Sequence, residues 1–174
     1  MPSRKGRKRP RVVDLSALLE ALTKADIEFI VVGGLAAVAQ GAPITTMDMD
    51  IVHRQSNDNI DKLLAFLKKI DAIHRRLDDK ILQPKKRDLS GRGHKLFATR
   101  FGPLYVLAVI EEGRGYDDLL PDTVEIEFRE HRVRVLSLKT LVELKQRSRD
   151  PKDLQRLPVL EETLRQSSAN NDRD

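Results

Sequence analysis

The sequence predicts an α+β fold, in which helices pack on a mixed β-sheet. Three patterns lead to this prediction. A strand, a glycine pair and a short helix follow one another between Phe29 and Gln40. Two stretches, 95–110 and 124–136, have the pattern of β-hairpins, and the other apolar segments recur at the spacing of amphipathic helices. At 174 residues, the chain is suited to one domain with a sizeable core.

We expect a disordered basic tail over residues 1–13, the domain over 14–165 and a disordered polar tail over 166–174. Six of the 32 Lys and Arg residues lie within residues 4–11 and no acid lies within 1–11, which leaves 26 basic against 27 acidic groups in the rest of the chain. The sequence pI of about 9.6 therefore describes the tail, and it does not by itself indicate that the domain binds nucleic acid.

Composition also limits the cellular setting. The chain has no cysteine, which excludes disulfides and thiolate metal sites and fits a reducing compartment. The longest apolar stretches fall short of the roughly 18 residues that a membrane helix needs, and no signal-peptide core follows the basic start. We therefore expect a cytoplasmic protein without membrane contact.

The first half of the chain alternates helices and strands. Asp14 precedes leucines at helical spacing and is a plausible N-cap, while Gly33-Gly34 interrupts a β-branched run. The predicted elements are a helix over 14–25, a strand over 29–32, a helix over 35–40, a strand over 47–52 and a helix over 57–70.

The second half begins with a charged excursion over 71–94. Together with Lys95 it carries the densest positive cluster of the domain, formed by Lys80, Lys85, Lys86, Arg87, Arg92 and Lys95. A hairpin follows, in which strands 95–101 and 104–110 flank Gly102-Pro103, and a second hairpin pairs 124–128 with 132–136. Leucines at helical spacing then predict one helix from Leu138 and another that Pro151 opens.

Asp48 and Asp50 are the most informative side chains. They share one face of the predicted strand over 47–52, and Met47, Met49 and Ile51 share the other. Asp is a poor strand former and costly to bury, so a cation between the two carboxylates is expected. Their spacing of about 6.5 to 7 Å suits Mg²⁺, which takes a few carboxylates together with water and phosphate oxygens.

The glycine pair and the two aspartates together resemble the signature of the nucleotidyltransferase superfamily, whose fold is similar to the palm of beta-type DNA polymerases. The resemblance rests on Gly33-Gly34 and on residues 46–51, and later segments extend it over roughly residues 14–160. It implies an enzyme that transfers a nucleoside monophosphate from an NTP to a hydroxyl on RNA, protein or a small molecule, with Mg²⁺ or Mn²⁺ as cofactor.

By this resemblance, Asp48 and Asp50 are the catalytic, metal-holding residues. Gly33, Gly34 and Thr46 would contact the triphosphate. The resemblance also places Lys145, Lys152 and Asp153 near the nucleotide; the alternative for these three residues is that they are ordinary charges on an exposed helix face.

The chain departs from the superfamily pattern at three positions. Tyr105 stands where related proteins carry a third carboxylate, and a phenol with a pKa of about 10 cannot replace that group as a base or metal ligand at neutral pH. Glu111 is the next acid of the same strand parity, but six residues of strand would place it about 20 Å farther on. Gln40 and Ile44 stand where relatives often carry His and Arg.

Three functions remain open at this stage. The first is an active nucleotidyltransferase, with residues 4–11 and 80–95 guiding an RNA acceptor such as tRNA. The second is a degenerate nucleotide- or RNA-binding protein of the same fold. The third is an interaction partner, for instance one component of a toxin–antitoxin pair. The sequence does not specify the oligomeric state.

Overall fold

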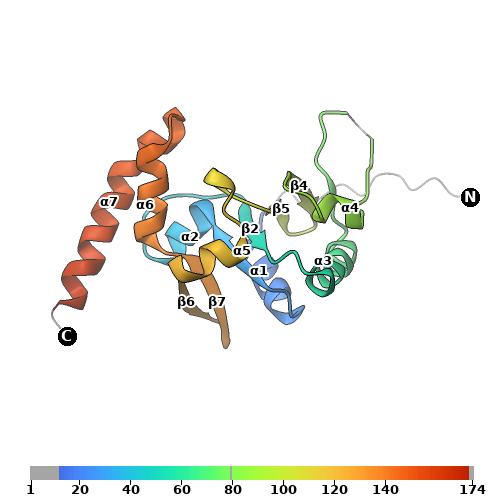
Figure 1. The fold of residues 1–174 in the computed structure, drawn as a ribbon, viewed down its shortest axis with the longest axis horizontal. Coiled ribbons are helices and arrows are strands. Elements are labelled where there is room, and N and C mark those ends of the chain that lie inside the picture. The colour runs from blue at the N-terminus through green and yellow to red at the C-terminus, as the bar shows by residue number, and fades with distance from the viewer. Residues whose placement is uncertain (1–11, 79, 173–174) are drawn as a thin grey trace, which may run out of the picture.

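The computed structural model describes residues 12–78 and 80–172 (Figure 1). Residues 1–11 of the predicted basic tail, which include the cations of 4–11, lie outside this range. The helices are α1 (Leu15–Lys24), α2 (Gly33–Ala39), α3 (Asn57–Lys69), α4 (Lys86–Leu89), α5 (Tyr116–Leu119), α6 (Leu138–Arg147) and α7 (Pro151–Asn171), with 3₁₀ turns η1 (Glu111–Gly113) and η2 (Leu120–Asp122). No helix among the described residues is long and apolar enough to cross a membrane.

A seven-stranded mixed sheet forms the centre of the domain, which confirms the predicted α+β class. Its strand order is β3-β4-β5-β2-β1-β7-β6. Strand β1 pairs in parallel with β7, and β2 pairs in parallel with β5, whereas all the other neighbours are antiparallel. The strands are β1 (Phe29–Val32), β2 (Met49–His53), β3 (Ile73–His74), β4 (His94–Thr99), β5 (Gly102–Leu107), β6 (Thr123–Phe128) and β7 (His131–Leu136).

The core surrounds the central strands. All four residues of β1 are buried, so this strand is covered on both faces. Asp14 caps α1 as predicted, because its side chain accepts a hydrogen bond from the N–H of Ala17 at 2.9 Å. The large side chains that are fully buried include Leu18, Leu22, Ile30, Met49, Ile51, Leu63, Leu67, Phe97 and Leu104.

Strand β2 begins two residues later than the sequence predicts. Its antiparallel pairing with β1 stops at Val32 and Asp50, because Gly33 leaves the sheet there. The Thr46 hydroxyl instead donates to the carbonyl oxygen of Asp48 at 3.2 Å. Met47 is therefore 60 % exposed and does not share the buried face of Met49, contrary to the prediction.

Two other boundaries also differ from the sequence prediction. The first hairpin turns at Arg100 and Phe101, while Gly102 already pairs with Thr99 as the first residue of β5. The Thr99 hydroxyl holds this turn, since it donates to the Gly102 carbonyl and accepts from the N–H of Phe101. Helix α7 continues to Asn171, so residues 166–171 are helical rather than part of a disordered tail.

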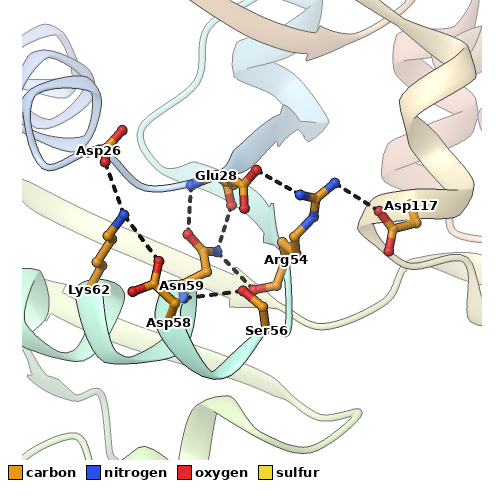
Figure 2. Close-up of polar contacts among 8 residues, drawn as sticks. All are labelled: Asp26, Glu28, Arg54, Ser56, Asp58, Asn59, Lys62 and Asp117. Carbon is orange, nitrogen blue, oxygen red and sulfur yellow. Dashed lines mark hydrogen bonds and ion pairs between the residues drawn. The ribbon is translucent and has the colours of Figure 1, made fainter.

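A polar network fixes β1 and β2 against α3 at the sheet end opposite Gly33 (Figure 2). The Asn59 side chain accepts from the N–H of Glu28 at 2.8 Å and donates to the carbonyl oxygens of Glu28 and Arg54. The Arg54 guanidinium pairs with Glu28 and Asp117. These contacts anchor the strand that carries Asp50.

His53 has a structural role, as its strand parity indicates. Its ring is buried and lies 3.1 Å from the Leu107 carbonyl oxygen and 3.0 Å from that of Leu89. Burial lowers the pKa of His53, although the two carbonyl contacts act in the opposite direction. The ring therefore links the end of β2 to β5 and α4.

Candidate active site

The glycine turn and the aspartates meet in space. Gly33 follows β1 with φ of +67°, a conformation that favours glycine, and a Cβ at this position would collide with the Asp50 carboxylate. The antiparallel register explains the contact, because it places Asp50 beside Val32 at the end of β1. The two halves of the predicted motif therefore form one site.

Asp48 and Asp50 are both partly buried at the start of β2. Burial raises the pKa of Asp50 to about 6, the negative charge of Asp48 adds to this, and Lys145 opposes it. A cation between the two carboxylates would reduce their mutual repulsion. Thr46 lies beside them, with its hydroxyl 3.5 Å from a carboxylate oxygen of Asp48.

Tyr105 occupies the position next to Asp50. The parallel register of β2 and β5 pairs these two residues directly, so their side chains project from the same face of the sheet. A phenol, not a carboxylate, thus lies beside Asp50 on the neighbouring strand. That related proteins carry a carboxylate at this position stays a prediction of the sequence resemblance.

Lys145 and Asp153 face each other across the α6–α7 junction. They form an ion pair, and the Ser148 hydroxyl donates to the other oxygen of Asp153 at 2.6 Å. Burial would raise the pKa of Asp153, but the hydrogen bonds from Lys145 and Ser148 hold this pKa below its ordinary value. Neither residue is an isolated surface charge, whereas Lys152 is exposed.

A cavity of about 180 Å³ lies between the glycine turn and α6. Polar groups from four segments of the chain reach it, together with an apolar wall. The lining residues are Val32, Gly33, Asp50, Leu107, Ile110, Glu111, Leu136, Leu141, Leu144, Lys145 and Asp153. A carboxylate, an ammonium group and a leucine-rich surface in one cavity suit a ligand with both charged and apolar parts.

Glu111 lies at this cavity, contrary to the sequence expectation. That expectation assumed that β5 continues, but the strand ends at Leu107 and the chain turns back through a bridge between Val109 and Gly115. Glu112 has φ of +63° within this turn, and it pairs with Arg147 of α6 at 3.0 Å. The turn therefore brings Glu111 to the same cavity as Asp50.

Arg156 is a site residue that sequence patterns did not indicate. Its guanidinium donates to the Thr45 carbonyl oxygen at 3.3 Å, and it lies 3.4 Å from the point that a Cβ on Gly34 would occupy. By contrast, Gln40 and Ile44 have structural roles. The Gln40 side chain hydrogen-bonds Leu136 and Leu138, and Ile44 packs against the core.

The residues present fit a divalent metal ion held by two carboxylates. Within residues 12–78 and 80–172, no group of three or more His, Asp or Glu side chains is placed to hold a metal. Mg²⁺ commonly takes one or two carboxylates and completes its shell with water and substrate phosphates. Asp48 and Asp50 match that mode of binding.

Several solved structures share this architecture. The lincosamide antibiotic adenylyltransferase LnuA, bound to lincomycin, has a TM-score of 0.57 at 12 % identity and covers 86 % of this chain and 97 % of its own. ANT(2")-Ia in complex with adenylyl-2"-tobramycin has a TM-score of 0.53 at 12 % identity, and the match covers 91 % of this chain and 98 % of the ANT(2")-Ia chain. A nucleotidyltransferase-like structure from Thermotoga maritima has a TM-score of 0.51 at 16 % identity, with 92 % and 98 % covered.

These likenesses confirm the fold that the sequence resemblance implied: the chain has the nucleotidyltransferase fold. No protein-family model and no curated protein sequence matches the chain.

Proposed function

We propose that the protein is a divalent-metal-dependent nucleotidyltransferase that moves a nucleoside monophosphate from an NTP to a hydroxyl acceptor. The observation that carries this proposal is the contact between Gly33 and the Asp50 carboxylate beside a cavity that also contains Lys145. A turn without side chains, a carboxylate and a cation thus lie around one cavity. The fold is shared with two antibiotic adenylyltransferases, which supports the proposal.

Asp48 and Asp50 are proposed to hold Mg²⁺ or Mn²⁺. When bound, such an ion neutralises charge on the phosphates and orients the attacking and leaving oxygens. Asp50 must lose its proton first, and its pKa of about 6 allows this at neutral pH.

The other residues have separate proposed roles. Gly33, Gly34 and Thr46 border the space for the triphosphate. Lys145 contacts the nucleotide in the cavity, and Asp153 positions Lys145 through their ion pair. Lys152 is exposed one turn before Arg156 on α7, where it adds positive charge near the phosphates.

Glu111 is the proposed acceptor of the proton from the attacking hydroxyl. Tyr105 is unsuited to this step because a neutral phenol is a poor base. Glu111 borders the same cavity as Asp50, and its exposed side chain can move toward an acceptor that enters there. Glu111 can therefore supply, from the turn after β5, the carboxylate base that β5 itself lacks.

A degenerate nucleotide- or RNA-binding protein is the second candidate. The position of Tyr105 directly beside Asp50 favours it, because a bound NTP would then meet metal ligands without the carboxylate of the superfamily pattern. Membership of a toxin–antitoxin pair stays a prediction of the sequence.

The acceptor is proposed to be RNA. Residues 4–11 and the cation cluster over 80–95 are the proposed contacts with its phosphates. Five of the six cluster cations, all except Lys95, are exposed. The alternative is a small hydroxyl compound, since the LnuA structure contains lincomycin and the ANT(2")-Ia structure contains an adenylylated tobramycin.

One comparison tests these functions. Wild type, Asp48→Ala and Tyr105→Asp are each incubated with every α-labelled NTP, Mg²⁺, and total tRNA, lincomycin or tobramycin as acceptor. Label transfer that is lost in Asp48→Ala supports the enzyme, and the labelled product identifies the acceptor. An inert wild type and an active Tyr105→Asp variant support the degenerate protein. If calorimetry detects no NTP binding to any of the three proteins, both proposals fail.

A further inference from the structure

The segment over 33–50, which carries the glycine turn and both aspartates, includes no Lys or Arg. The triphosphate of an NTP carries several negative charges, and two carboxylates lie in the same segment. A cation from another part of the fold must therefore balance the phosphates that a metal ion does not contact.

Helix α7 places a guanidinium at this point. One terminal nitrogen of Arg156 donates to the Thr45 carbonyl oxygen at 3.3 Å. The other lies 3.4 Å from the position of a Cβ on Gly34, and the Thr46 hydroxyl lies 3.1 Å from the same position. A guanidinium, a hydroxyl and a backbone without a side chain thus surround one small space.

Arg156 is available to an anion. Its side chain is exposed and donates to a neutral carbonyl, and no carboxylate of the described residues lies within 4.0 Å of it. The charge of Arg156 contributes to the lowered pKa of the nearby Asp153, but the direct partners of that carboxylate are Lys145 and Ser148. Arg165, farther along the same helix, differs in this respect because it forms an ion pair with Glu162.

The position along the turn indicates which phosphates are involved. Gly33 abuts Asp50, where the metal is proposed to lie, whereas the next residue, Gly34, faces Thr46 and Arg156. Because the metal orients the attack on the α-phosphate, that phosphate belongs beside Gly33 and the β- and γ-phosphates beside Gly34. A planar guanidinium donates two parallel hydrogen bonds to phosphate oxygens. We infer that Arg156 binds the β- and γ-phosphates of the NTP, so that the C-terminal helix supplies a guanidinium to the triphosphate site. This inference rests on the proposed function.

Binding measurements test the inference without turnover. Calorimetry with Mg²⁺ compares α,β-methylene analogues of the four NTPs with the four nucleoside monophosphates. We expect Arg156→Gln to weaken binding of the preferred triphosphate analogue by at least about tenfold and to change monophosphate affinity less than about twofold. Arg156→Lys should lie between wild type and Arg156→Gln, because it keeps the charge and loses the fork. Arg165→Gln is the matched control and should bind both ligands as wild type does.

Two outcomes overturn the inference while the proposed function stands. One is a triphosphate affinity of Arg156→Gln equal to that of wild type. The other is an equal loss for triphosphate and monophosphate, which would mean that Arg156 acts on the nucleoside or on the fold. If wild type binds no triphosphate analogue, the inference and the proposed function both fail. Urea unfolding of each variant establishes that the compared proteins are folded.

Discussion

At the scale of single residues, Asp50 links the chemistry of the site to the stability of the fold. Burial and the charge of Asp48 raise its pKa to about 6 in the folded protein, against an ordinary value of 3.8. The folded state therefore holds the proton more tightly than the unfolded state does. Stability from this group is present below pH 4 and is lost as the pH rises through 6, by about 2–3 kcal/mol in the absence of metal.

The first prediction concerns Asp50→Asn. The amide cannot ionise, so the metal-free variant should be more stable than wild type at pH 8 by about 2 kcal/mol, and the gain should vanish at pH 4. Urea unfolding at both pH values measures this difference. Mg²⁺ should stabilise wild type at pH 8 and have little effect on the variant. A gain of equal size at both pH values would contradict the assigned cause.

The second prediction concerns Glu111. If this carboxylate accepts the proton of the attacking hydroxyl, Glu111→Gln should lower kcat by about 10²- to 10⁴-fold and leave NTP affinity near that of wild type. Glu112→Gln is the control, since Glu112, the next residue of the turn, pairs with Arg147 and does not line the cavity. Equal activity of Glu111→Gln and wild type would exclude the role.

The sequence predicts some of these residues and not others. Asp48, Asp50 and the position of Tyr105 follow from side-chain alternation along strands and from the resemblance, and the register confirms that Tyr105 lies beside Asp50. Glu111 and Arg156 are different. A turn after β5 places the first, and helix packing brings the second beside residues 45–46, more than a hundred positions away. Periodicity carries no signal for either contact.

At the scale of elements, α2 is fastened to the start of α6 through one side chain. The Gln40 amide nitrogen donates to the carbonyl oxygens of Ala36 and Leu136 at 2.9 Å, and its oxygen accepts from the N–H of Leu138 at 2.9 Å. Helix α6 carries Lys145 to the cavity. This bridge therefore sets the distance between the glycine turn and the lysine.

The third prediction is that Gln40→Ala lowers the free energy of unfolding by about 2 kcal/mol, because the backbone groups of Ala36, Leu136 and Leu138 each lose a hydrogen-bond partner. NTP affinity should fall as well, since α6 is no longer held beside α2. Chemical unfolding and calorimetry measure the two effects. Gln166→Ala removes an exposed amide that contacts only Glu162 in the described part of the chain, so it should change stability by less than about 0.5 kcal/mol. Equal effects of both variants would contradict the bridge.

Most elements follow from local patterns, and the misplaced boundaries have local causes. The leucine spacing predicts α1, α3 and α6, and alternation predicts both hairpins. The late start of β2 depends on where β1 ends, which the residues around Met47 do not encode. Helix α7 continues through a polar stretch beyond residue 165. Because this stretch has no apolar residues at helical spacing, periodicity does not predict that it is helical.

At the scale of the whole molecule, the cation cluster over 80–95 and the helices α6 and α7 lie at opposite ends. Figure 1 shows α4 and the loop around it at one end and α6 with α7 at the other. The cluster cations Lys85, Arg87 and Arg92 are exposed at the first end, and in the described chain only Lys86 of the exposed cluster residues forms a short ion pair, with Asp61. An RNA acceptor could thus contact the β3–β4 side of the sheet while its hydroxyl enters the cavity beside β5.

The fourth prediction tests that arrangement. Replacing Lys85, Arg87 and Arg92 together with Gln should weaken tRNA binding and reduce the slope of log K against log salt by roughly 2 to 3, since each lost phosphate contact removes about 0.7 to 0.9. Filter binding at several salt concentrations measures the slope. The matched control replaces three exposed cations at the other end, Lys139, Arg149 and Arg165, with Gln. The two triple variants lose the same net charge, so a local contact lowers the slope only in the first. Equal slopes for the two triple variants would show that RNA affinity depends on net charge alone. The acceptor would then be sought among small hydroxyl compounds.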